Sequence, residues 1–217
     1  MRQNNNLILG LTGSIASGKS TTSNYLKNKG FKIIDCDIIA RELLNEKKII
    51  SLLVSKFTTS ILSKDLKIDR KALSKIVFND NSKRKLLDDL LRPYLMEKID
   101  KEIDIVDNKI KNSIIILDCP LLFESNLDKF CDETITIDID YKIQIERLMS
   151  RNSISKDFAK KMIYSQLSSK EKAEKSDYVI TNNETLSSLC NEINSILNAI
   201  IIKFIGTKIK RLEVVSE

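Results

Sequence analysis

Histidine is absent from the 217 residues of this chain, and so is tryptophan. Without an imidazole, the chain cannot build a histidine-based catalytic triad, a zinc site on histidine or a histidine phosphorelay. Any chemistry that it performs must therefore use carboxylates, lysine, arginine and the backbone.

Glycine and proline are also scarce, with 5 and 2 residues respectively, and no segment rich in proline, glycine and serine divides the chain. This composition argues against independent domains on a flexible tether. Hydrophobic residues make up 42% of the sequence, which is enough for a sizeable buried core. We expect one large domain, or one core that carries one or two insertions.

Cysteines and long apolar runs are few as well. No CxxC pair and no secretory signal are present, so we expect reduced, buried thiols in a cytoplasmic protein. No window reaches the roughly 18 apolar residues of a membrane span. The strongest candidate, residues 196–205, is interrupted by Asn198 and Lys203, so we expect no membrane partner. The cysteines are Cys36, Cys119, Cys131 and Cys190.

The net charge of +6 suits either a nucleic acid or a ligand with several phosphates. Aromatic residues make up only 6% of the chain, and they form no stripe on which single-stranded bases could stack. We therefore expect no nucleic-acid partner.

Short runs rich in isoleucine, valine and leucine alternate with longer segments of helical periodicity. Such runs are typical of buried parallel strands, and parallel neighbours need helical crossovers. The sequence therefore predicts an α/β fold with a mostly parallel five-stranded sheet flanked by helices. The expected strands are residues 7–11, 32–34, 114–117, 134–139 and 178–180.

Two long segments interrupt this alternation. Residues 38–112 carry leucines at helical spacing, which predicts a helical insertion, and residues 141–176 form a second charged helical stretch. Residues 184–202 have the periodicity of a C-terminal helix that covers the sheet. The remaining core comprises residues 1–37, 113–140 and 177–217.

The most specific motif follows the first strand. Residues 13–20 match the pattern G-x-x-x-x-G-K-[ST] and precede a plausible helix at residues 21–29. In this setting backbone N–H groups turn inward at a helix N-terminus and surround a phosphate chain. We expect ATP to be bound by Gly13, Ser14, Ile15, Ala16, Ser17, Gly18, Lys19, Ser20 and Thr21.

The last three residues of this P-loop have separate expected roles. Lys19 offers an ammonium group to the β- and γ-phosphates and so takes part in catalysis. The Ser20 hydroxyl coordinates Mg²⁺, while Thr21 supports the phosphates from the first helical turn. The motif therefore predicts that the chain binds Mg-ATP, without naming the acceptor.

Two carboxylate clusters follow other predicted strands. Asp35 and Asp37 come after the second strand, and Asp118 comes after the third. Since the carboxyl ends of parallel strands meet beside the P-loop, one aspartate of the first pair can orient the acceptor hydroxyl, and we choose Asp37. We expect Asp118 to hold magnesium through its water shell. Both clusters could instead be solvated caps at strand ends.

A basic helical segment follows the fourth strand. Arg147 and Arg151 are four residues apart, so both can project from one helix face toward ATP and the transferred phosphoryl group. The surrounding lysines, among them Lys172, indicate a basic lid that excludes water. In isolation, the arginine pair could also be a solvated face.

The chain resembles the dephospho-CoA kinase family nearly from end to end. The resemblance includes Asp-Cys-Asp-Ile-Ile-Ala-Arg at residues 35–41 and Asp-Cys-Pro-Leu-Leu-Phe-Glu at residues 118–124. Other matching segments keep the family's order and spacing. They are residues 11–13, 69–78, 144–151, 166–173 and 177–182.

This resemblance implies a P-loop NTPase fold with a helical acceptor-binding insertion and a helical lid, and it names the acceptor. Members transfer the γ-phosphoryl group of ATP to the 3′-hydroxyl of the dephospho-CoA ribose, giving CoA and ADP in the last step of coenzyme A biosynthesis. By the same resemblance, Asp37 is the base, Arg147 is the lid arginine and Asn182 lies near the adenine. The implied acceptor-binding residues are Asp37, Arg41, Arg70, Leu121 and Glu124.

The chain also departs from the family pattern. Ser14 and Ala16 stand where the family often has glycine, and Thr181 replaces a common acidic residue. Arg92 stands before Pro93, where the family commonly has histidine. An arginine can still contact an anionic acceptor, but the histidine's role is not carried over to it.

Two other functions remain open at this point. One is a P-loop kinase that acts on a nucleoside or nucleoside monophosphate, which the order of the motifs opposes. The other is a nucleic-acid-binding ATPase or NTP switch, although no guanine-reading NKxD motif occurs. In either case we expect a monomer or a weak homo-oligomer.

Overall fold

The computed structural model describes the backbone of residues 6–215, with side chains except at 78, 79, 81 and 207–215. The chain ends, residues 1–5 and 216–217, belong to the predicted core segments and lie outside the described range. The elements in chain order are β1 (Leu7–Gly13), α1 (Lys19–Asn28), β2 (Lys32–Asp35), α2 (Cys36–Leu43), α3 (Lys47–Phe57), the short helix η1 (Thr59–Ile61), α4 (Arg70–Asn79), α5 (Asn81–Lys109), β3 (Ile114–Asp118), η2 (Asp128–Phe130), β4 (Glu133–Asp138), α6 (Tyr141–Asn152), α7 (Lys156–Ile163), α8 (Ser169–Lys175), β5 (Tyr178–Thr181) and α9 (Leu186–Val215).

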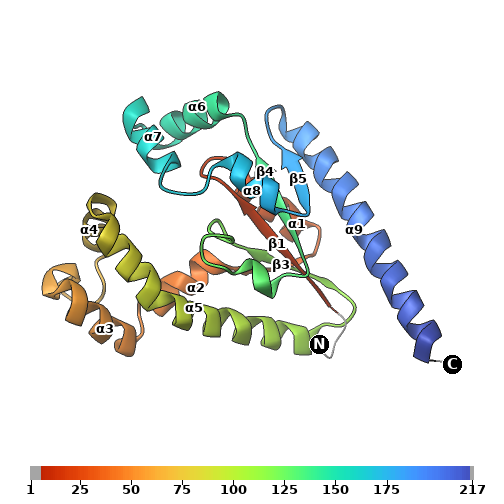
Figure 1. Cartoon of the computed structure of the whole chain (residues 1–217), viewed down its shortest axis with the longest axis horizontal. Helices are drawn as coiled ribbons and strands as arrows, with labels where there is room; N and C mark the ends of the chain where they lie inside the picture. Colours follow the sequence, from red (N-terminus) through yellow and green to blue (C-terminus); the bar gives the residue numbers. More distant parts are fainter. Residues whose placement is uncertain (1–5, 216–217) are drawn as a thin grey trace. The chain divides into compact units, whose positions relative to one another are not determined.

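β1 is the central strand of a five-stranded sheet with the order β2-β3-β1-β4-β5 (Figure 1). It pairs in parallel with β3 and β4, and β4 pairs in parallel with β5. All five predicted strands are present, within two residues of their predicted ends. Because β1 and β3 run in parallel, Gly13 and Asp118, their last residues, lie at the same edge of the sheet.

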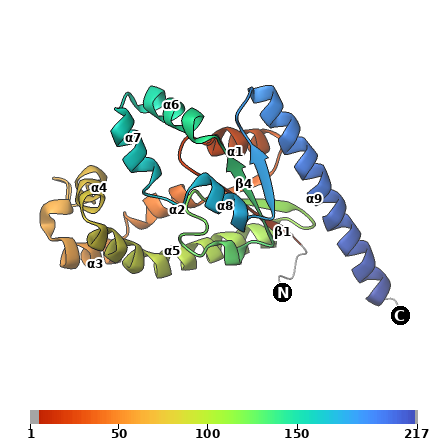
Figure 2. The same ribbon diagram turned by 45° about the horizontal axis from the view of Figure 1, so that its top comes forward.

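The two faces of this sheet are covered by different helices. Ile135 of β4 belongs to a core cluster with Leu26 of α1 and Ile193 of α9. Side chains alternate along a strand, so the neighbouring Thr136 points the other way, where its hydroxyl donates to the Lys172 carbonyl of α8 at 3.2 Å. Helices α1 and α9 therefore cover one face and α8 the other (Figure 2).

The chain divides into two compact units, of which the first comprises residues 1–33 and 110–217 and the second residues 34–109. The second unit is built from α2 to α5, and α4 and α2 both pack on α5. Its core residues come from α2, α3, η1 and α4, and they are Leu43, Ile49, Leu53, Phe57, Ile61 and Leu73. The acceptor-binding role of residues 38–112 and the lid role of residues 141–176 stay predictions.

Helix α9 is longer than the sequence indicated, because helical backbone continues to Val215 instead of ending near residue 202. By length and composition, Leu186–Gly206 could cross a membrane, with 22% of its most apolar window buried, so the expectation that no such window exists is wrong. In the structure this segment packs on the sheet through residues such as Ile193. Its one lysine, Lys203, forms an ion pair with Glu133 of β4.

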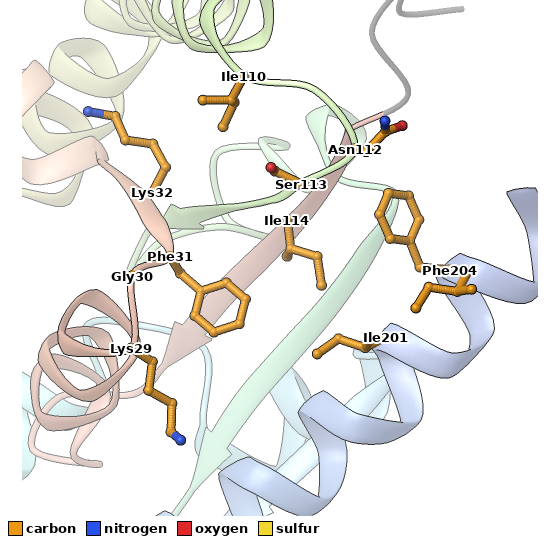
Figure 3. Close-up of a pocket in the computed structure, with 11 residues that line it drawn as sticks. Lys29, Gly30, Phe31, Lys32, Ile110, Asn112, Ser113, Ile114, Ile201 and Phe204 are labelled. Atoms are coloured by element: carbon orange, nitrogen blue, oxygen red, sulfur yellow. The ribbon is translucent and has the colours of Figure 1, made fainter.

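A cavity of about 820 Å³ lies in the first unit, at the amino ends of the strands and thus away from Gly13 (Figure 3). The Phe31 ring points into it from the segment before β2, Ile114 lines it at the start of β3, and Ile201 and Phe204 close it from α9. These apolar residues continue the core to this end of the sheet, while Lys29, Lys32, Asn112 and Ser113 provide the polar part of the lining.

Candidate active site

The P-loop joins β1 to α1, and two glycines permit its path. A Cβ atom on Gly13 would lie 2.5 Å from Ser17 Oγ, and one on Gly18 would lie 2.1 Å from Asn182 Nδ2. Gly18 also has a φ of 101°, in the left-handed region. Both positions therefore require glycine. The loop is closed by a turn in which the Ser17 N–H donates to the Ser14 carbonyl at 3.1 Å.

Ala16 is the strained residue of this loop. Its φ of 62° lies in the left-handed region, which a Cβ atom disfavours. Of the two positions where the family often has glycine, Ser14 and Ala16, only Ala16 adopts a positive φ. The chain therefore tolerates local strain at the tip of the phosphate-binding loop.

Lys19 and Asp118 meet beside the P-loop. Lys19 begins α1 and Asp118 ends β3, and Lys19 Nζ lies 2.5 Å from Asp118 Oδ1. The two side chains are only 14% and 6% exposed, so water screens their attraction weakly. The structure thus brings together the residues that the sequence assigned to phosphate and magnesium.

The donors at this edge fit magnesium. Ser20 offers a hydroxyl and Asp118 a carboxylate, which are hard oxygen ligands of the kind that Mg²⁺ prefers. Ser20 and Thr21 are exposed at the start of α1. Within residues 6–215, no group of three or more His, Cys, Asp or Glu side chains could hold a metal. These donors suit an ion that keeps several waters and arrives with the nucleotide phosphates.

Two buried side-chain amides donate hydrogen bonds to the P-loop. Asn182, in the segment after β5, donates from Nδ2 to the Ser17 carbonyl at 2.7 Å. Gln144 of α6 donates from Nε2 to Ser14 Oγ at 2.9 Å and to the Ile15 carbonyl at 2.8 Å. These hydrogen bonds hold three residues of the loop, Ser14, Ile15 and Ser17, so its backbone N–H groups keep their directions.

Gln144 was given no role by reasoning from the sequence. A signal was present, since Gln144 is followed by the core residues Ile145 and Leu148 on one helix. A polar side chain on a buried helix face needs hydrogen-bond partners, and a P-loop carbonyl is one of them here. Asn182 was placed near the adenine, whereas its amide nitrogen is engaged by the P-loop. Adenine contact by Asn182 stays a prediction.

Helices α6 and α7 pack directly on the tip of the P-loop. Ile15 and Ala16 contact the core cluster that these helices form with Ile145 and Ile163. Arg147, one turn after Gln144, is half-buried on α6. The segment predicted to be a lid is thus anchored to the loop at this end.

Arg151, the second arginine of the predicted pair, is more exposed than Arg147. Arg151 lies in the last turn of α6 and donates from Nε to Asn152 Oδ1 at 3.1 Å. Arg147 and Arg151 share one helix, and their contacts with ATP stay predictions.

Lys172 does not belong to a basic lid surface, contrary to expectation. It is 0% exposed, and its ammonium donates to the Pro120 carbonyl and to Glu124, with Oε1 at 2.9 Å. The sequence placed Lys172 with exposed lysines because charged residues are mostly at the surface. Only tertiary packing provides the carboxylate and carbonyl that allow it to be buried.

The segment after β3 carries two residues that the resemblance assigned to the acceptor. Leu121 is half-buried. Glu124 accepts hydrogen bonds from the Leu167 N–H at 3.0 Å and from Lys172. Its carboxylate therefore ties this segment to the α7–α8 connection, and acceptor contact by either residue stays a prediction.

The other predicted acceptor residues lie in the second unit or at its start. Asp35 is the N-cap of α2, where one carboxylate oxygen accepts from the Asp37 and Ile38 N–H groups at 2.8 and 3.0 Å. Asp37 lies exposed in the first turn and Arg41 exposed in the last turn of the same helix. These two side chains are four residues apart, hence on one helix face.

Arg70 is exposed at the first position of α4, after the N-cap Asp69. Arg92 lies in α5, and its guanidinium is 3.4 Å from the Asp89 carboxylate. The position of Arg70 and the ion pair of Arg92 do not assign an acceptor role to either residue, so both predictions remain open.

Comparisons with known proteins agree with the fold and the P-loop. The family model described as dephospho-CoA kinase matches residues 7–188. A dephospho-CoA kinase from Fusobacterium nucleatum is 42% identical over 187 residues, covering 86% of this chain and 95% of the relative. One from Oceanobacillus iheyensis is 41% identical over 193 residues, covering 88% of this chain and 96% of the relative.

A solved structure is also similar. The dephospho-CoA kinase from Campylobacter jejuni superposes with a TM-score of 0.69 at 31% sequence identity, covering 91% of this chain and 98% of that one. Sequence identity above 30% and nearly complete coverage extend over the P-loop and the strands that position it. The chain belongs to the dephospho-CoA kinase family.

Proposed function

We propose that this chain, an ATP-dependent kinase by its family, transfers the γ-phosphoryl group of Mg-ATP to the 3′-hydroxyl of the dephospho-CoA ribose. The products are CoA and ADP, and the reaction is the last step of coenzyme A biosynthesis. The observation that carries this proposal is the Lys19–Asp118 pair at a braced P-loop, in a chain that matches the family over residues 7–188.

ATP binds through its phosphates to the loop from Gly13 to Thr21. The backbone N–H groups surround the phosphate oxygens, and the Lys19 ammonium neutralises charge between the β- and γ-phosphates. Arg147 and Arg151 approach from α6 and stabilise the charge on the transferred group. Gln144 and Asn182 keep the loop in shape.

Magnesium binds with the nucleotide. The Ser20 hydroxyl and the Asp118 carboxylate would hold it, the latter through water, and the bound ion supplies charge neutralisation on the phosphates. Lys19 and Asp118 balance each other's charge beside this position.

Asp37 orients the acceptor. Its carboxylate accepts a hydrogen bond from the ribose hydroxyl, whose oxygen attacks the γ-phosphorus in line. The new O–P bond forms as the bond from the γ-phosphorus to the bridging oxygen of ADP breaks. A carboxylate is a far weaker base than an alkoxide, so Asp37 takes the proton late in this step. Asp35 suits this role less, because its carboxylate already caps α2.

Arg41 and Arg70 provide cationic contacts for the anionic acceptor, with Leu121 and Glu124 beside it. We also infer a cytoplasmic enzyme, monomeric or weakly self-associating, without a nucleic-acid or membrane partner. The four cysteines lie far apart in the sequence and include no CxxC pair, which supports a reducing compartment. Size-exclusion chromatography and vesicle flotation test these points.

The direct test incubates the purified protein with Mg-ATP and, separately, with dephospho-CoA, AMP, UMP, uridine or shikimate. We expect ADP and CoA from dephospho-CoA at a rate far above that of the other acceptors. Turnover of another acceptor without formation of CoA would overturn the proposal. Omission of magnesium should abolish the reaction, and its restoration by Mg²⁺ tests the metal.

A further inference from the structure

A fully buried ammonium lies behind the active-site edge of the sheet. Lys172, in the middle of α8, donates to the Pro120 carbonyl, and it lies 2.9 Å from Glu124 Oε1 and 3.2 Å from Oε2. Glu124 in turn accepts from the Leu167 N–H at 3.0 Å. The network therefore fastens the segment after β3 to α8 and to the connection that precedes it.

The segment held in this way carries Asp118. The Cys119 N–H donates to the Leu11 carbonyl of β1 at 2.9 Å. The carbonyl of the following residue, Pro120, accepts a hydrogen bond from Lys172 and another from the Thr12 hydroxyl, the latter at 3.2 Å. Asp118 thus lies two residues before a carbonyl that two side chains hold, one from β1 and one from α8.

Stability alone gives little reason to bury this lysine. Removing an ammonium ion from water costs several kcal/mol, and a buried ion pair can often be replaced by apolar residues with no loss of stability. A methionine would fill much of the same space without that cost. A long cationic donor differs in one respect, because it can hold a backbone carbonyl and a carboxylate at once.

We propose that Lys172 is a positioning residue for phosphoryl transfer. Through Pro120 it fixes Asp118 against the Lys19 ammonium, and it does so from the helix that ends the α6–α8 segment bearing Arg147. This inference rests on the proposed function, because it concerns the same site. A shift of Asp118 by a fraction of an ångström alters the charge around the transferred group while the P-loop amides still hold ATP.

The test uses four variants with the wild type: Lys172→Met, Glu124→Gln, the double variant Lys172→Met/Glu124→Gln and the control Lys175→Met. Lys175 is exposed on the same helix. The double variant leaves no buried charge without a counter-charge, so it is expected to fold. For each protein we would measure the melting temperature, the Kd for ATP and the kcat and KM for CoA formation.

We expect the double variant to melt close to the wild type and to bind ATP within about threefold, while kcat falls by about 10- to 100-fold. Lys172→Met should lose at least as much kcat and Lys175→Met less than about threefold, whereas Glu124→Gln, beside the acceptor, should act mainly on the KM for dephospho-CoA and lose less kcat than the double variant. A double variant with wild-type kcat would show that Lys172 only balances Glu124. A double variant that fails to fold would make the role purely structural, and a Glu124→Gln variant as impaired as the double would assign the effect to Glu124. Each of these results overturns the inference.

Failure of the proposed function gives a different result. A wild-type protein that makes no CoA contradicts that function, whatever Lys172 does. A wild-type protein that makes CoA while the folded double variant is equally fast contradicts only the inference.

Discussion

The ammonium of Lys19 lies 2.5 Å from the carboxylate of Asp118, at the edge of the sheet where β1 and β3 both end. Each side chain is largely withdrawn from water, and each supplies the counter-charge that the other needs. The pair therefore holds Lys19 in place at the P-loop before any phosphate has to be recognised, which lowers the cost of organising the site.

Lys19→Ala should weaken ATP binding and lower kcat/KM by about 100-fold or more, because it removes a preorganised cation from the transferred phosphate. It also leaves Asp118 without its ion-pair partner, so a lower melting temperature is expected. ATP titration and initial rates test this, with Lys27→Ala, in the exposed last turn of α1, as the control. Retained activity in a folded Lys19→Ala variant contradicts the proposed P-loop function.

Asp37→Asn should keep ATP and dephospho-CoA binding but lose about 100- to 10,000-fold in kcat, as expected for the loss of an acid–base group. Asp35→Asn is the matched control, since an asparagine side chain can still accept the two N–H groups that Asp35 caps. It should retain stability and most of kcat. The reverse pattern, with Asp35→Asn inactive and Asp37→Asn active, would move the base to Asp35.

Ala16→Gly should leave the free energy of unfolding unchanged or raise it by about 0.5 kcal/mol, because relief of left-handed strain offsets the greater entropy of the unfolded glycine. Ala199→Gly, at an exposed position within α9, should instead lower it by about 1 kcal/mol. Urea denaturation of both variants measures the difference. Equal losses would mean that the φ of 62° at Ala16 carries no strain.

Gln144→Leu removes two hydrogen bonds to the P-loop, each worth about 1 kcal/mol. The Kd for ATP should rise by about tenfold, since the loop must be ordered on binding. Gln144→Glu should raise the Kd for ATP further, because an ionised carboxylate cannot donate to the Ile15 carbonyl and repels phosphate. Calorimetric titration with ATP tests both, with the exposed Glu146→Gln as the control. Unchanged ATP affinity in Gln144→Glu would refute the bracing role.

The Lys203–Glu133 pair predicts a pH dependence of stability. Glu133 raises the pKa of Lys203 above its ordinary value of 10.5, chiefly through their hydrogen bond. The pair's stabilising contribution is therefore fully present below about pH 10.5 and is lost as the pH rises through the higher pKa of the folded state.

Urea denaturation at pH 8 and at pH values above 10.5 should show this loss. Lys203→Met should have a lower free energy of unfolding than the wild type at pH 8, and this difference should shrink as the pH rises. Lys29→Met removes an exposed lysine without a carboxylate partner in the described residues. The difference in free energy of unfolding between this variant and the wild type should therefore not shrink in this way. If the difference between Lys203→Met and the wild type stays constant with pH, the stabilising role of the Lys203–Glu133 pair is contradicted.

Local patterns in the sequence were sufficient for the strands and the loop. Apolar runs bounded by polar residues located all five strands, because a parallel strand buried on both faces needs a nearly continuous apolar run. The spacing of Gly13, Gly18 and Lys19 located the P-loop, because a loop that surrounds phosphate requires glycine and lysine at fixed positions. The C-terminal end of α9 was misjudged, since helix ends carry weak local signals.

The chain by itself thus determined a P-loop on an α/β sheet, and its ordered motifs indicated the family. Only the tertiary structure decided which polar side chains support that loop. Gln144 and Lys172 are distant in sequence from the groups that they bind, and a buried amide or ammonium is defined by partners that folding brings to it. The same reason separates the aspartate that caps α2, Asp35, from the aspartate that lies exposed beside it, Asp37.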